Sequence, residues 1–128
     1  MPGPGASLIV PTALPLSTTL AAAAATAAGT AATDAAADAV MWGAELAELE
    51  ISIAELVIKQ GVVGAVNPAA GIAMGLQITG MQTQALRLAA HQLNAESAAA
   101  FYTAQGAYLT SLAVTYAALL GWATADTA

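Results

Sequence analysis

The chain has 128 residues, a length that suits one small domain. Apolar residues make up 59% of the sequence and charged residues only 8%, whereas soluble domains usually carry about 25% charged residues. Two cations, Lys59 and Arg87, stand against eight acids, so we expect no nucleic-acid partner. The sequence has no cysteine and one histidine, so we also expect no disulfide, no metal centre and no catalytic triad.

Alanine supplies 37 of the positions. It is the best helix former, but it buries little area per residue. An alanine-rich helix therefore gains stability by approaching a neighbour closely along a long line of contact. We predict an all-α fold, an elongated antiparallel hairpin of two long helices that assembles into a bundle with partner helices.

The first 16 residues hold four of the five prolines, which predicts an extended or irregular arm over residues 1–16. No Lys or Arg precedes the apolar run that follows, so we expect no cleaved signal peptide. Residues 17–128 are predicted to form a single helical-hairpin domain. Its first helix is expected over about residues 18–60, capped by one of the hydroxyl residues at 17–19.

Three glycines and an Asn-Pro pair mark the next segment, Gly61-Val-Val-Gly-Ala-Val-Asn-Pro-Ala-Ala-Gly71. Glycine and proline both interrupt helices, so the segment predicts a turn over about residues 61–71. The second helix is then expected over about residues 72–124, where no further proline occurs.

Apolar side chains recur at spacings of three and four residues in both predicted helices. In the second helix they form two faces, one containing Met81 and Leu88 and the other Leu86 and Leu93. A hairpin cannot cover apolar surface on two sides of one helix, so a further partner is required. The partner interface is predicted to comprise Leu46, Leu49, Ile53, Leu56, Met81, Leu86, Leu88, Leu93, Phe101 and Tyr108.

Four glutamates cluster in the first predicted helix, at positions 45, 48, 50 and 55. A di-metal site would also need Glu-x-x-His motifs and acids on the facing helix. The only histidine, His91, belongs to no such motif and lies one turn from Arg87 on a polar stripe. We therefore interpret the glutamates as a solvated face, His91 as a surface residue, and the protein as one that is not an enzyme.

Two uncharged segments, residues 61–86 and 97–125, are each long enough to span about 30 Å of hydrocarbon. Both contain Gln, Asn, Ser or Thr, and neither is flanked by a cluster of Lys and Arg. A membrane-embedded or membrane-active helical hairpin is therefore the alternative prediction, with the later segment as the better candidate.

Five of the six aromatic residues lie in the last quarter of the chain, where Trp122 and Asp126 stand four residues apart. The lysine- and arginine-poor hairpin, the turn with Gly61-Val-Val and Pro68-Ala-Ala, and the tail from Ala98-Ala-Ala-Phe-Tyr onward resemble the PE family of mycobacterial type VII secretion substrates. Trp122 stands where that family has tyrosine in its terminal Tyr-x-x-x-Asp/Glu secretion signal, and the family's N-terminal Pro-Glu pair is absent.

The resemblance implies a secreted or cell-envelope protein without a cleaved signal peptide, in which Trp122 and Asp126 form the secretion signal. It also implies that the protein has no cofactor and that it pairs with a longer, PPE-like helical partner. Self-assembly is the other arrangement that would cover the apolar faces. A more distant member of the same helical-hairpin superfamily would show the same features. The leading hypothesis is a non-enzymatic interaction protein, and the alternative is the membrane hairpin.

Overall fold

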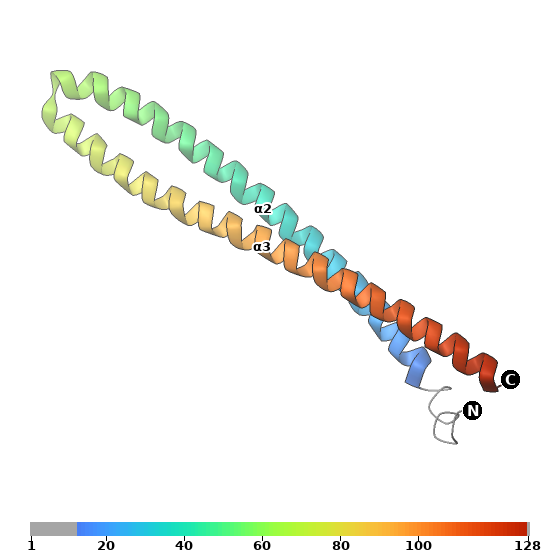
Figure 1. Ribbon diagram of the computed structural model, residues 1–128. Helices are drawn as coiled ribbons and strands as arrows, with labels where there is room; N and C mark the ends of the chain where they lie inside the picture. The colour runs from blue at the N-terminus through green and yellow to red at the C-terminus, as the bar shows by residue number, and fades with distance from the viewer. Residues whose placement is uncertain (1–12, 128) are drawn as a thin grey trace. The chain divides into compact units, whose positions relative to one another are not determined.

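The structure is a computed structural model that describes residues 13–127, with side chains described for residues 15–125. It consists of two α-helices, α2 (Ala13–Val66) and α3 (Pro68–Thr127), and the described residues contain no strand (Figure 1). The two helices run antiparallel and pack against each other. The prediction of an all-α helical hairpin is therefore confirmed.

Helix α2 begins at Ala13, five residues before the predicted start, so the predicted arm over residues 1–16 is wrong for its last four residues. The rest of that arm lies outside the described residues. Pro15 sits in the first turn, where backbone N–H groups have no partner within the helix, so its missing donor costs no hydrogen bond. The hydroxyl of Thr19 donates to the carbonyl oxygen of Pro15 at 3.0 Å and does not cap the helix.

The predicted turn over residues 61–71 is also wrong in extent, because only Asn67 lies outside the two helices. The Oδ1 atom of Asn67 accepts a hydrogen bond from the backbone N–H of Ala70 at 3.2 Å, which makes Asn67 the N-cap of α3. Pro68 follows at the first helical position, where its missing N–H is no loss. The backbone N–H of Asn67 still donates to the carbonyl of Val63 at 2.8 Å, and no described residue has a positive φ.

Gly64 and Gly71 bring the two helices together beside this turn, and both remain helical. A Cβ atom added to Gly71 would lie 2.8 Å from the Cα of Gly64, closer than real Cβ atoms approach backbone. A Cβ atom added to Gly64 would lie 3.4 Å from the Cα of Gly71, which is an ordinary contact. Each helical glycine costs about 1 kcal/mol relative to alanine, and the close approach of the two helices explains why glycine is present at position 71.

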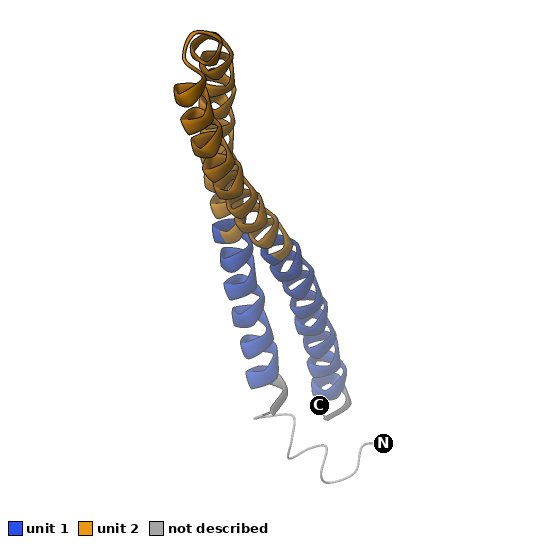
Figure 2. Ribbon diagram, turned by 90° about the vertical axis from the view of Figure 1, so that its left-hand side faces the viewer, with its two compact units in different colours: residues 1–34, 98–128 blue, residues 35–97 orange. Residues whose placement is uncertain are grey.

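The chain divides into two compact units, which Figure 2 shows in different colours. Unit 2 contains residues 35–97, with the end of α2, the turn and the beginning of α3. Unit 1 contains residues 1–34 and 98–128, of which the helical parts from 13 to 34 and from 98 to 127 are described. In each unit a segment of α2 packs against a segment of α3.

Unit 2 is held together by a seam of half-buried residues that recur at alternating steps of three and four in both helices. This 3.5-residue repeat is the pattern of a coiled-coil interface. Ile78, with 6% of its surface exposed, is the most buried large side chain. The seam comprises Trp42, Leu46, Leu49, Ile53, Leu56, Gln60 and Val63 of α2 and Met74, Ile78, Met81, Ala85, Leu88, Gln92 and Ala95 of α3.

Unit 1 is built differently, because α2 contributes mainly alanine to its interface. Ala21 and Ala28 are seven residues apart, and each has 6% of its surface exposed. Opposite them, a Cβ atom added to Gly106 would lie 3.6 Å from the Cβ of Ala28, so the helices approach closely here as well. The larger side chains come from α3, whose half-buried residues include Tyr102, Leu109, Tyr116 and Leu120.

Candidate interaction surface

The ionisable side chains of the described residues do not assemble into a metal site, since no three His, Cys, Asp or Glu side chains come together within that part of the chain. The glutamates of α2 at positions 45, 48, 50 and 55 are all exposed. The prediction that they form a solvated face is confirmed. The remaining features that could recognise another molecule are the apolar surfaces.

Six of the ten residues predicted to face a partner belong instead to the seam of unit 2. They are half-buried where α2 packs against α3, so the hairpin itself already covers most of their surface. The periodicity of the sequence indicated apolar faces correctly, but it could not show which face the second helix covers. These six residues are Leu46, Leu49, Ile53, Leu56, Met81 and Leu88.

The other four predicted residues are exposed: Leu86, Leu93, Phe101 and Tyr108 have between 62% and 73% of their surface accessible. In unit 2, Leu86 and Leu93 share the side of α3 that lies away from the seam with two more exposed side chains, Ile72 and Leu76. We call these four residues, Ile72, Leu76, Leu86 and Leu93, the α3 outer strip.

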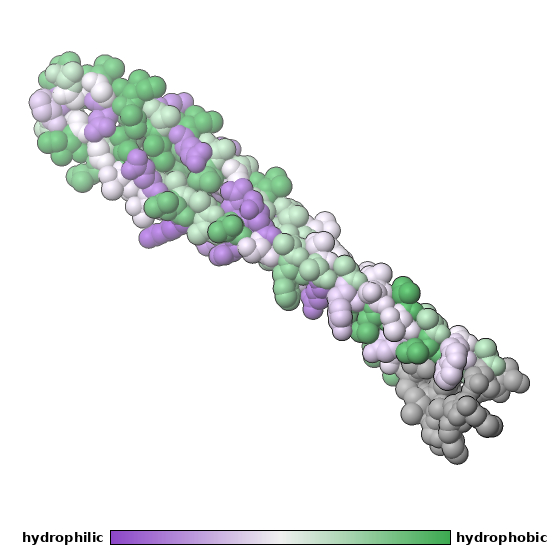
Figure 3. All heavy atoms as spheres, viewed as in Figure 1, coloured by the Kyte–Doolittle hydropathy of each residue, from purple (hydrophilic) through white to green (hydrophobic). Residues whose placement is uncertain are grey.

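Helix α2 carries an outer strip of its own, formed by Ile51, Ile58 and Val62, which our sequence analysis missed. The spacings of seven and four were visible in the sequence. They were missed because glutamates share this side of the helix: Glu48 and Glu55 precede Val62 by 14 and 7 residues. Figure 3 shows apolar side chains at the surface of unit 2, interspersed with hydrophilic ones.

Trp42 of the seam forms an aromatic pair with His91, which lies at the edge of the seam, and sequence reasoning did not identify this pair. The rings of Trp42 and His91 stack with centroids 4.7 Å apart and an angle of 22° between their planes. Trp42 is half-buried and His91 is exposed, as expected for a tryptophan that anchors a seam and a histidine at the surface. The pair fixes one point of the register between α2 and α3.

Two glutamines of the seam each lie against a glycine of the opposite helix. The Nε2 atom of Gln60 donates to the carbonyl oxygen of Gly71 at 3.0 Å and would lie 2.9 Å from a Cβ atom added to Gly75. The Nε2 atom of Gln92 would likewise lie 2.9 Å from a Cβ atom added to Gly43. Polar residues at seam positions specify register in coiled coils. Both Gln–Gly pairs do so here by shape, and Gln60 does so by its hydrogen bond as well.

The predicted secretion-signal residues lie at the end of α3. Trp122 has 62% of its surface exposed, so its ring is accessible to another molecule. Asp126 belongs to α3, but its side chain lies outside the described residues. The structure therefore places the aromatic half of the predicted signal on the surface.

By length and composition alone, one helix of the described residues could cross a membrane. That helix is α3, over Pro68–Ala125, and few residues of its most apolar stretch are fully buried within the chain. Core helices of soluble proteins meet the same criteria, so this observation is weak evidence for the membrane alternative.

Comparisons with known proteins identified no relative of this chain. The chain matches no protein-family model, no curated protein and no solved structure. The hairpin and its exposed surfaces are therefore the features that bear on function.

Proposed function

We propose that this chain is a non-enzymatic interaction protein, a helical hairpin whose outer strips are covered by helices of a partner protein. The observation that supports this most strongly is the exposure of the seven aliphatic side chains of the two strips, between 61% and 73% each. Burying one such side chain fully is worth about 1.5–3 kcal/mol. Apolar surface of this extent on a small domain is typical of an interaction site.

The spacing of the strips favours helices as the covering elements. Ile72, Leu86 and Leu93 are separated by multiples of seven residues, as are Ile51 and Ile58, which is the repeat that a partner helix would need. Each strip lies on the side of its helix away from the hairpin's own seam, so partner helices would pack on both sides. The complete assembly would then be a bundle of at least four helices.

The resemblance to the PE family supports a more specific proposal, in which the partner is a longer PPE-like protein. The chain would be exported by a type VII-like system and would act outside the cytoplasm or in the cell envelope. The exposure of Trp122 is compatible with a signal that another protein must contact.

Helix α3 favours one alternative, a membrane-embedded or membrane-active hairpin, because its length and composition would allow it to enter lipid. In that case the α3 outer strip would face acyl chains. The two functions differ in whether the chain requires a protein partner or a detergent to remain in solution.

The test is co-expression of the tagged full chain with a candidate helical partner, chosen from the reading frames that neighbour its gene. Leu86→Glu places an unpaired carboxylate in the proposed interface, which should weaken co-purification by about 100-fold or more. Asn94→Glu adds the same charge to an exposed position on the polar stripe and should have no effect. A chain that is a monodisperse monomer at high concentration without a partner contradicts the proposal, and a chain that needs detergent supports the membrane alternative.

A further inference from the structure

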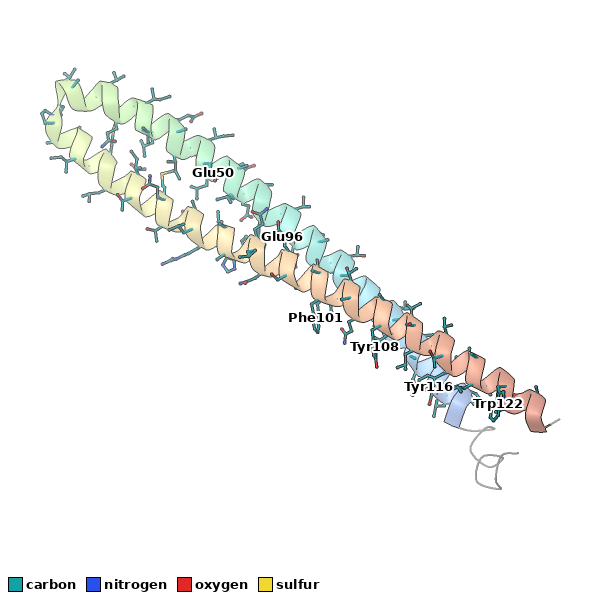
Figure 4. All side chains as sticks on the ribbon, viewed as in Figure 1. Glu50, Glu96, Phe101, Tyr108, Tyr116 and Trp122 are labelled. Carbon is teal, nitrogen blue, oxygen red and sulfur yellow. The ribbon has the colours of Figure 1, made fainter. Side chains whose placement is uncertain are left out.

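The two apolar strips of unit 2 differ in the charge that surrounds them. We call Ile51, Ile58 and Val62 the α2 outer strip. The unit 2 part of α2 carries five acids and one lysine, whereas the unit 2 part of α3 carries one acid and one arginine. Figure 4 shows Glu50, one of the five acids, on α2, and Glu96, the single acid, on α3. The α2 outer strip therefore lies in an acidic surface, and the α3 outer strip in a nearly neutral one.

Two of the five acids, Glu48 and Glu55, lie at the edge of the α2 outer strip. Each stands three residues before an isoleucine of the strip, so glutamate and isoleucine are neighbours on the helix surface. None of the other acids of the unit 2 part of α2 stands three or four residues from a strip residue. Seven residues of α-helix rise about 10.5 Å, so the two carboxylates recur at that spacing along the edge of the strip.

The negative charge of this edge is available to another molecule. The side chains of Glu48 and Glu55 are exposed, and neither forms an ion pair within the described part of the chain. The one cation nearby, Lys59, stands three residues before Val62, at the end of the strip that is closer to the turn. The edge is therefore acidic along the two isoleucines. Charged side chains at the edge of a helix–helix interface select the partner by the charges that they meet.

The acidic edge decides between the molecules that could cover the strip. A second copy of the chain brings a further net charge of −6 and only two cations, one on each helix. No helix of a second copy therefore offers two cations to meet Glu48 and Glu55. An anionic bilayer carries the same sign of charge as the edge, and carboxylates oppose entry into hydrocarbon. A cationic helix of a different protein is the occupant that fits.

We propose that the α2 outer strip binds a helix of a different protein that carries lysine or arginine at a seven-residue spacing along one edge of its own apolar seam. Those cations meet Glu48 and Glu55, while the apolar side chains of the same helix cover the strip. This inference rests on the proposed function, in which partner helices cover the outer strips, and it adds the chemistry of one of those helices. Complementary charge at such an edge contributes mainly to the choice of partner and to the rate of association.

The test uses three synthetic helical peptides, each about four heptads long, which share one leucine seam and carry lysine, glutamine or glutamate beside it. Fluorescence anisotropy measures the binding of each labelled peptide to the full chain with Leu86→Gln, which makes the α3 outer strip more polar without adding charge. The lysine peptide should bind at least about tenfold more tightly than the glutamate peptide, with the glutamine peptide between them. Raising the NaCl concentration from about 50 to about 500 mM should weaken only the lysine peptide, by about threefold or more.

Variants that remove charge locate the contact. Glu48→Gln combined with Glu55→Gln should weaken the lysine peptide by about threefold to tenfold and leave the glutamine peptide unchanged. Glu50→Gln combined with Glu96→Gln is the matched control, because it removes the same charge from exposed positions that do not neighbour the α2 outer strip. The inference is overturned if the lysine peptide binds no better than the glutamate peptide, or if the two double variants behave alike.

Ile58→Gln tests the proposed function separately from the charge. It should weaken the lysine and glutamine peptides alike, because both cover the α2 outer strip. If it weakens both while lysine and glutamate peptides bind equally well, only the inference about charge fails. If it weakens neither, helices do not cover this strip, and the proposed function fails there as well. Circular dichroism should show equal helix content in all variants, because every substituted side chain is exposed.

Discussion

Replacing one glycine beside the turn should reveal how closely the two helices approach. In Gly71→Ala the new Cβ atom would lie 2.8 Å from the Cα of Gly64, and neither backbone can move without shifting its helix. In Gly64→Ala the new atom would lie 3.4 Å from the Cα of Gly71, an ordinary contact. Gly80→Ala meets nothing within 4 Å and serves as the control for helix propensity.

The expected free energies follow from two opposing terms. A glycine-to-alanine change inside a helix stabilises by about 1 kcal/mol, and Gly80→Ala should show this gain alone. Gly71→Ala gains the same amount but pays an overpacking cost of about 1–3 kcal/mol. Gly71→Ala and Gly80→Ala should therefore differ by about 1–3 kcal/mol in the free energy of unfolding. Gly64→Ala should be much closer in stability to Gly80→Ala than to Gly71→Ala.

Urea denaturation followed by circular dichroism at 222 nm measures these differences. If the variants unfold in two states with the same m-value, a difference in their urea midpoints is a difference in stability. Thermal midpoints should separate Gly71→Ala from Gly80→Ala by roughly 4–12 °C. If Gly71→Ala is as stable as Gly80→Ala, the helices do not approach at this point. If Gly64→Ala is as unstable as Gly71→Ala, the inference that only position 71 is too close for a Cβ atom is wrong.

Three further predictions concern the cap, the aromatic stack and the C-terminal residues. Asn67→Ala should lower the free energy of unfolding by about 1 kcal/mol, while Asn67→Asp keeps the cap; an unchanged urea midpoint for the alanine variant would disprove the capping role. His91→Ala should lower the free energy of unfolding by about 0.5–1.5 kcal/mol and shift the fluorescence emission of Trp42. The emission is measured in a Trp122→Phe background, so that Trp42 is the single tryptophan, and an unaltered spectrum would contradict the stack. Trp122→Ala or Asp126→Ala should abolish export with little change in thermal stability, because packing at a helix end contributes little, whereas Trp122→Tyr should retain export. Normal export of both alanine variants would rule out the signal.

The helical character of the chain and its apolar periodicity were predictable, because both depend on residues close in sequence. Alanine content and the 3–4 spacing of Leu46, Leu49, Ile53 and Leu56 identified a seam that the structure contains. The position of the single break, inside residues 61–71, was also predicted correctly. The extent of that break was not, since Gly64 and Gly71 signal an interruption locally but serve a contact between two helices.

Only the tertiary structure decided which apolar faces remain available to another molecule. Met81 and Leu88 repeat with the same period as Leu86 and Leu93, yet the first pair is half-buried and the second exposed. Periodicity gives the angle between faces around one helix, but burial depends on where the other helix lies across the hairpin. The stack of Trp42 on His91 depends on the same register, which is set by contacts between residues 49 positions apart in the sequence. No local pattern encodes such a contact, because its energy exists only after the two helices have packed.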